Sequence, residues 1–170
     1  MVHEGKLWDS RYLYNMLRRV PETPPIIKDL PLAEVMNVLK PVFSKAGCQF
    51  AWTDSVYYLT SIEHLNRFLQ WFMRNRKKPY RVNKWDCENS AEQLRVEYQL
   101  WGTSAVGIYF RPSTPSQGNH ALSIALTFDD GKVKIWTVDT SQPKKARTVW
   151  AWEPHRHWEW DMAQSYWVYF

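Results

Sequence analysis

Residues 84–91, KWDCENSA, decide how the rest of the chain is interpreted. They follow an extended segment at 78–83 and begin a helical pattern whose apolar residues recur at spacings of three and four: Ala91, Leu94, Tyr98 and Trp101. Cys87 therefore lies at a helix start. Unpaired backbone N–H groups and the positive end of the helix dipole favour a thiolate over a thiol there. A thiolate becomes a catalytic nucleophile when a histidine and an orienting acid or amide join it in space.

Two later strands, joined by a tight turn, supply those partners. Residues 119–128 and 132–139 both have strand patterns, and Asp-Asp-Gly at 129–131 lies between them. An Asp-Gly pair between two such runs is a strong hairpin signal. The sequence therefore predicts two adjacent antiparallel strands.

The register of that hairpin decides whether a histidine and an acid meet. If the turn has two residues, Asp129 faces Lys132, and this pair fixes all later ones. His120 then faces Ser141, and Asp139 is its diagonal neighbour on the same sheet face. Such neighbours lie about 7–8 Å apart at the backbone, within reach of ring side chains. A bulged turn would shift the register by one residue and separate them.

Three short elements also resemble a known family: DCENSA at 86–91, GNHA at 118–121 and VDTSQP at 138–143. Together they are similar to the papain-like cysteine protease domain of the Marasmius oreades agglutinin. Relatives of that domain occur without a lectin module, some of them in bacteriophage genomes. The resemblance covers roughly residues 56–142. Ser90 departs from the family, which often has an aromatic residue at this position.

The resemblance implies an α+β fold of the papain-like or transglutaminase-like kind. Its nucleophile begins a helix that packs on an antiparallel sheet. It also implies a thiol hydrolase, most simply a cysteine peptidase with protein or peptide substrates and an acyl-enzyme intermediate. Cys87 would attack the carbonyl, His120 would take and return the proton, and Asp139 would hold the imidazole tautomer.

Two further groups complete the predicted site. The oxyanion needs donors aimed at its charge, and we expect the backbone N–H of Cys87 and the side chain of Asn83 to serve. In the agglutinin, acidic residues after the nucleophile bind calcium that activates the protease. Glu88 and Asn89 occupy matching positions and carry oxygen ligands suited to Ca²⁺. Alternatively, the Glu88 carboxylate only interacts favourably with the positive end of the helix dipole and binds no metal. The hydrolysis itself requires no cofactor.

Two other functions fit the same residues. One is an interaction or virion-component protein that keeps the fold without chemistry and binds through its Trp-rich tail. The other is an amide- or acyl-transfer enzyme, similar to a transglutaminase or a peptidoglycan amidase. An accessible Cys87 within reach of His120 would favour an enzyme, and a filled cleft would favour the binding protein.

The remaining sequence predicts the supporting elements. We expect a helix that begins near Pro31 and is kinked or restarted at Pro41, then strands at 49–53 and 56–59. Residues 60–63, TSIE, predict a capping box that opens a helix with a buried apolar stripe. A strand follows at 105–110, and residues 165–170 predict a closing strand.

The 170 residues indicate one domain: a helical N-terminal part at 1–55, a catalytic-like core at 56–142 and a Trp-rich segment at 143–170. Eleven Trp residues are unusual for this length. The net charge of +5 is modest, and its densest basic run, 74–78, matches a helix end, so nucleic acid is not an expected partner.

The location of the protein is predicted from three features. No stretch approaches the roughly 20 apolar residues that cross a bilayer, so a membrane partner is not expected. The first residues lack a secretory pattern. Cys48 and Cys87 are too few for a disulfide framework, and we expect both to be reduced. Together these features predict an intracellular protein of the cytoplasm, a host cytoplasm or a virion.

Overall fold

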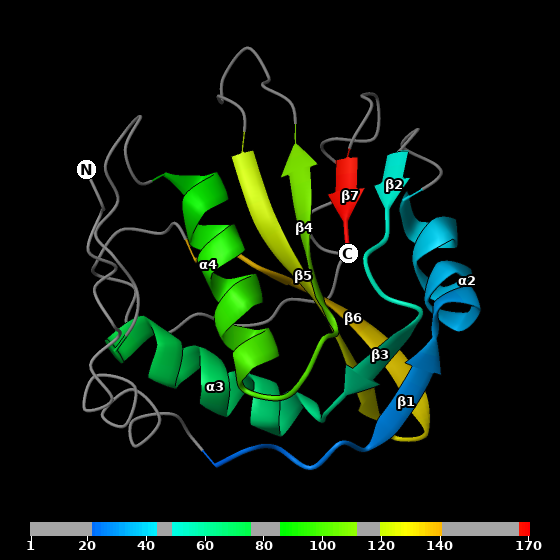
Figure 1. Cartoon of the computed structure of the whole chain (residues 1–170), viewed down its shortest axis with the longest axis horizontal. Coiled ribbons are helices and arrows are strands. Elements are labelled where there is room, and N and C mark those ends of the chain that lie inside the picture. The colour runs from blue at the N-terminus through cyan, green and yellow to red at the C-terminus, as the bar shows by residue number, and fades with distance from the viewer. Residues whose placement is uncertain (1–21, 44–48, 76–85, 112–119, 141–166) are drawn as a thin grey trace, which may run out of the picture.

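The computed structural model describes residues 22–43, 49–75, 86–111, 120–140 and 167–170 of the chain. Its architecture is α+β, as predicted, with helices against a central sheet (Figure 1). The described helices are α2 (Leu32–Phe43), α3 (Ile62–Asn75) and α4 (Cys87–Leu100). None of the helices within these ranges combines the length and apolarity needed to cross a membrane.

The central sheet has five strands in the order β2-β7-β4-β5-β6. Their bounds are Gln49–Ala51 for β2, Trp167–Tyr169 for β7, Val106–Arg111 for β4, His120–Asp129 for β5 and Lys132–Val138 for β6. The pairs from β7 to β6 are antiparallel, whereas β2 and β7 are parallel. The predicted closing strand is therefore confirmed as β7, and it lies inside the sheet.

A second sheet joins β1 (Lys28–Pro31) to β3 (Val56–Leu59). The predicted helix start near Pro31 is confirmed within one residue, because α2 begins at Leu32, but the strand at 28–31 that pairs with β3 was not predicted. Of the kink or restart predicted at Pro41, the restart was wrong, because one helix runs across this residue, and the kink stays a prediction. Pro41 lies in the last turn of α2, which continues to the buried Phe43. Proline has no backbone N–H, so one helical hydrogen bond is missing, and it is missing only in the last turn. The buried side chains of Leu39 and Phe43 hold this turn in place.

The β5–β6 hairpin has the predicted register. Asp129 pairs with Lys132, and the ladder continues to Ser123 opposite Val138. Asp130 and Gly131 form the turn with φ angles of 55° and 73°. Two positive φ angles are the signature of a type I′ turn, whose twist matches that of the strands.

Alternation along the strands gives the central sheet two apolar faces. One face packs against α2 and carries, with others, Tyr109, Ile124, Leu126 and Val168. The opposite face packs against α3 and α4 and carries Val106, Ala125 and Val138. The apolar residues predicted for α4 are all buried on this side: Ala91, Leu94, Tyr98 and Trp101. The predicted stripe of α3 is likewise core, with Leu65, Phe68, Leu69 and Phe72 fully buried.

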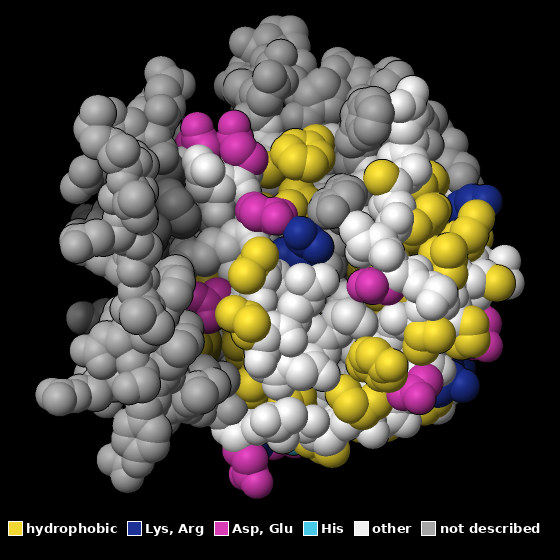
Figure 2. All heavy atoms as spheres, viewed as in Figure 1, with side chains coloured by type: hydrophobic (Ala, Val, Ile, Leu, Met, Phe, Trp, Pro, Cys, Tyr) yellow, Lys and Arg dark blue, Asp and Glu magenta, His cyan; other side chains and the backbone are white. Residues whose placement is uncertain are grey.

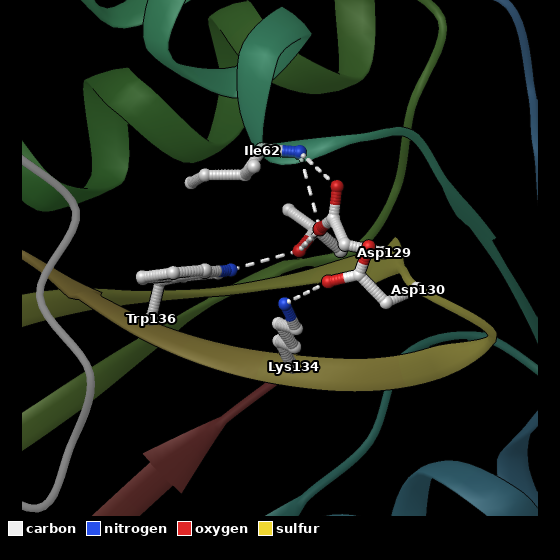
Figure 3. A network of polar contacts seen from close by, with 6 residues as sticks. Ile62, Asp129, Asp130, Lys134 and Trp136 are labelled. Carbon is white, nitrogen blue, oxygen red and sulfur yellow. Dashed lines mark hydrogen bonds and ion pairs between the residues drawn. The ribbon is translucent and has the colours of Figure 1, made fainter.

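The N-terminus of α3 is held by the hairpin tip (Figure 3). The Asp129 carboxylate accepts hydrogen bonds from the Ile62 backbone N–H, at 3.0 and 3.2 Å. Thr127 donates its hydroxyl to the same carboxylate and accepts a bond from Trp136 Nε1 at 2.8 Å. The tip of the sheet is thereby fixed to the start of a helix on one of its faces.

The capping box predicted at 60–63 was wrong. Thr60 Oγ1 is buried and finds no hydrogen-bond partner, and Glu63 bonds Arg67 at 2.6 Å, one turn along the helix. Ser61 Oγ, directly before α3, accepts the His64 backbone N–H at 3.4 Å, and the acid that caps the Ile62 N–H comes from Asp129, 67 residues away in sequence. A local sequence pattern cannot reveal a cap supplied from another element.

Candidate functional site

The start of α4 is where the sequence placed it. Asp86 is the N-cap residue and Cys87 is the first helical residue. The Asn89 side-chain oxygen accepts a hydrogen bond from the Asp86 backbone N–H at 3.3 Å, which satisfies a group at the helix end. Cys87 packs in a small apolar cluster with Ala91, Ile108 and Ala121. The helix therefore presents its first residue to β4 and β5.

The structure brings His120 and Asp139 together, as the hairpin register predicts. His120 is the first residue of β5, and Asp139 directly follows β6. The Nε2 atom of His120 lies 3.1 Å from Asp139 Oδ2. The Asp139 side chain is 7% exposed and that of His120 is 25% exposed. A largely buried carboxylate thus orients an imidazole that solvent and ligands can still reach.

The Cys87 thiol has a different hydrogen-bond partner from the one expected. Its Sγ donates to Glu88 Oε2 at 3.1 Å, and not to His120. Burial raises the pKa of Cys87, the Ala121 backbone hydrogen bond opposes this, and the Glu88 carboxylate raises that pKa further. The prediction that the helix start favours a thiolate was therefore wrong for this state, because desolvation and the adjacent carboxylate outweigh the backbone donors.

The pKa of Glu88 is shifted by the same contact with Cys87, in the opposite direction. Its pKa is lowered, first because the Cys87 thiol donates a hydrogen bond to it, and in part through the charge of His120. The proton therefore stays on sulfur while Glu88 is ionised. The contribution of His120 also places the imidazole within electrostatic range of the α4 N-terminus. Glu88 thus links the Cys87 thiol, through a hydrogen bond, with the charge of the His120 imidazole.

A solved structure, the PSL1a–E64 complex, shares this architecture. It matches with a TM-score of 0.57 over 84% of this chain at 17% sequence identity. This chain spans only 51% of the length of that chain. The fold is papain-like. No family model and no curated protein sequence matches this chain.

The other predicted site residues have mixed outcomes. Asn83 lies outside the described residues, as does Cys48. Glu88 and Asn89 are at the helix start as predicted. However, Glu88 Oε2 accepts a hydrogen bond from the Cys87 thiol, and Asn89 Oδ1 accepts one from the Asp86 backbone N–H. In the part of the chain that the structure describes, no three His, Cys, Asp or Glu residues gather in a metal-binding group.

Sequence reasoning missed two contacts of the sulfur. Glu88 was considered as a metal ligand and as a dipole partner, not as the acceptor of the thiol proton. Its adjacency to Cys87 at a helix start was the available signal. The Ala121 backbone bond to the sulfur depends on how α4 approaches β5, which no local pattern specifies.

Proposed function

We propose that this protein is a thiol hydrolase of the cysteine peptidase type, with Cys87, His120 and Asp139 as its catalytic triad. One observation carries the proposal. The His120 ring and the Asp139 carboxylate are 3.1 Å apart, and the charge of His120 helps to lower the pKa of Glu88, whose carboxylate accepts the hydrogen bond of the Cys87 thiol. An acid, an imidazole and a thiol on three different elements are the parts that acyl transfer requires.

The contact between His120 and Asp139 supports a separate role for each ring nitrogen. Because Nε2 faces Asp139, Nδ1 is the nitrogen left for the sulfur. Nδ1 takes the thiol proton as Sγ attacks the substrate carbonyl, and the backbone N–H of Cys87 supports the oxyanion. The imidazolium then protonates the leaving amine, and a thioester remains on Cys87. Water, deprotonated by His120, hydrolyses this thioester and frees the enzyme. Asp139 stabilises the imidazolium in both steps.

The structural neighbour supports the same class of chemistry. E64 is an inhibitor of cysteine proteases, and PSL1a was solved in complex with it. A shared fold does not fix a function, so the argument for this chain depends on its own triad. A cysteine peptidase would act on peptides or proteins.

The Cys87–Glu88 bond describes a resting state. The thiol must leave Glu88 Oε2 and meet His120 before it can be deprotonated. Cys87 is 7% exposed, so substrate access requires a local rearrangement. These two facts favour a second candidate function, that of a protein with this fold but without catalytic activity. The labelling experiment below distinguishes this function from a thiol hydrolase.

Calcium binding is a second part of the proposal. The similarity to the agglutinin protease domain rests on the elements at 86–91, 118–121 and 138–143, and it implies that Glu88 and Asn89 hold Ca²⁺. A bound cation would neutralise Glu88 and release the Cys87 thiol from it. Glu88 and Asn89 would hold the ion, which would affect only the Cys87–Glu88 bond, and the triad would carry out the hydrolysis.

Site-resolved labelling with E64 tests the triad. We expect covalent modification at Cys87 in the wild type and none in Cys87→Ala. His120→Ala should slow the labelling strongly, because the proposed base for the thiol proton is removed. His64→Ala is the matched control, since His64 bonds Ser61 at 2.8 Å in α3 and should not affect the rate. Peptide hydrolysis that survives Cys87→Ala, or E64 labelling that is the same in His120→Ala, would refute the triad.

A further inference from the structure

An aromatic residue that the proposed mechanism does not use lies beside the thiol. Phe110, near the end of β4, is 40% exposed, whereas Ile108 two residues earlier is 3% exposed. Single exposed hydrophobic side chains are common and need no explanation. Phe110 is distinguished by its position, which the sheet register defines.

The register places Phe110 directly opposite Ala121. Residues opposite each other on antiparallel strands have Cβ atoms about 4.5–5.5 Å apart. The Ala121 side chain in turn packs on Cys87. The Phe110 ring is thus one side chain away from the residue that carries the sulfur.

Alternation confirms which face the ring occupies. Tyr109 belongs to the core beneath α2, so Ile108 and Phe110 point to the opposite face. Ile108 is in the Cys87 cluster on that face. Because α4 begins at Cys87, the helix covers Ile108 and leaves Phe110 open. Figure 2 shows hydrophobic surface exposed where α4 begins and β4 ends, next to acidic side chains.

We propose that Phe110 is the specificity-determining residue of this site and binds an apolar side chain of the substrate, next to the scissile bond. The inference rests on the proposed function, since it assumes that Cys87 attacks a peptide. The exposed ring offers a flat apolar surface for an aromatic or branched side chain.

Paired active-site reagents test this subsite. Peptidyl chloromethyl ketones that differ only in phenylalanine or serine, placed in turn at the two residues nearest the electrophile, would be compared by the labelling rate of Cys87. We expect the phenylalanine reagent to react at least about tenfold faster at one position, which is the range for an apolar subsite. Phe110→Ser should abolish this preference and leave the iodoacetamide rate unchanged, while Phe110→Tyr should keep it.

The matched control is Tyr58→Ser, because Tyr58 is a similarly exposed aromatic, at 44%, in the separate two-stranded sheet. Equal rates for both reagents on the wild type, or a preference that survives Phe110→Ser, would overturn the proposal. If Cys87 reacts with none of the reagents, the proposed triad is refuted, and the subsite is tested by peptide binding. A phenylalanine-containing peptide titrated by NMR into Cys87→Ala should then bind at least about tenfold more weakly when Phe110→Ser is added, and equal binding would refute the subsite.

Discussion

The bond between Cys87 and Glu88 gives a prediction of unusual direction: removing an acid next to the nucleophile should make it more reactive. The Sγ and Oε2 atoms are 3.1 Å apart, and Glu88 is an exposed side chain whose charge raises the pKa of Cys87. Glu88→Gln removes that charge and keeps the size of the side chain. The pKa of Cys87 should fall, and the thiolate population at neutral pH should rise.

The size of the effect follows from Coulomb's law. Two charges at that separation interact by about 1.3 kcal/mol in water, and the exposure of Glu88 places the pair near this lower limit. Since about 1.36 kcal/mol is a factor of ten, the thiolate population of Glu88→Gln should be about tenfold higher below the pKa. Added salt should reduce the difference.

The assay is the pH dependence of iodoacetamide labelling at Cys87, resolved from Cys48 by peptide mass. Glu88→Gln should move the rising limb of the profile to lower pH. Glu92→Gln is the control, because Glu92 pairs with Arg95 at 2.8 Å one turn along α4 and makes no recorded bond to sulfur. A slower rate at pH 7 in Glu88→Gln, or the same profile as the wild type, would show that the Glu88 carboxylate does not raise the pKa of Cys87.

Three further outcomes are expected. Asp139→Asn should lower peptide hydrolysis on the order of 10²-fold or more without unfolding the protein, because the amide no longer stabilises the imidazolium; activity within twofold of wild type would remove Asp139 from the triad. Millimolar Ca²⁺ should raise the thermal midpoint, and Glu88→Ala should cancel that rise, while no shift in the wild type would mean that residues 88–89 hold no calcium. Asp129→Ala should destabilise the protein by about 1–2 kcal/mol through the lost α3 cap, seen as a lower midpoint, whereas Asp130→Asn, which removes an exposed pair with Lys134 and suits the positive φ angle of the turn, should change little.

The parts of the site that the sequence predicted depend on short-range rules. An Asp-Gly turn demands positive φ angles, and this requirement fixed the register that brings His120 to Asp139. Helical spacing likewise located Cys87 at the first residue of α4. Both predictions needed only a few consecutive residues, because turn geometry and helix periodicity are local properties.

The parts that the sequence could not predict depend on how elements meet. Asp129 caps α3 from another element, and burial reversed the direction expected for the pKa of Cys87. The helix dipole is a property of the segment, but desolvation depends on Ile108 and Ala121 packing against the sulfur-bearing residue. Phe110 also became a candidate only when the register of β4 on β5 was known.

The type I′ turn at Asp130 and Gly131 has a consequence for how this site can change over generations. Residues 120 and 129 mark the two ends of β5, which at about 3.3 Å per residue separates the turn from the imidazole by roughly 30 Å. A one-residue insertion in the turn would shift β6 by one position and reverse which face Asp139 occupies. Substitution by Asn or Gly at position 130 would preserve the loop and its frame. The proposed site therefore depends on the length of a distant surface loop far more than on its chemistry, and we expect variants with altered loop length to lose the His120–Asp139 contact even where they fold.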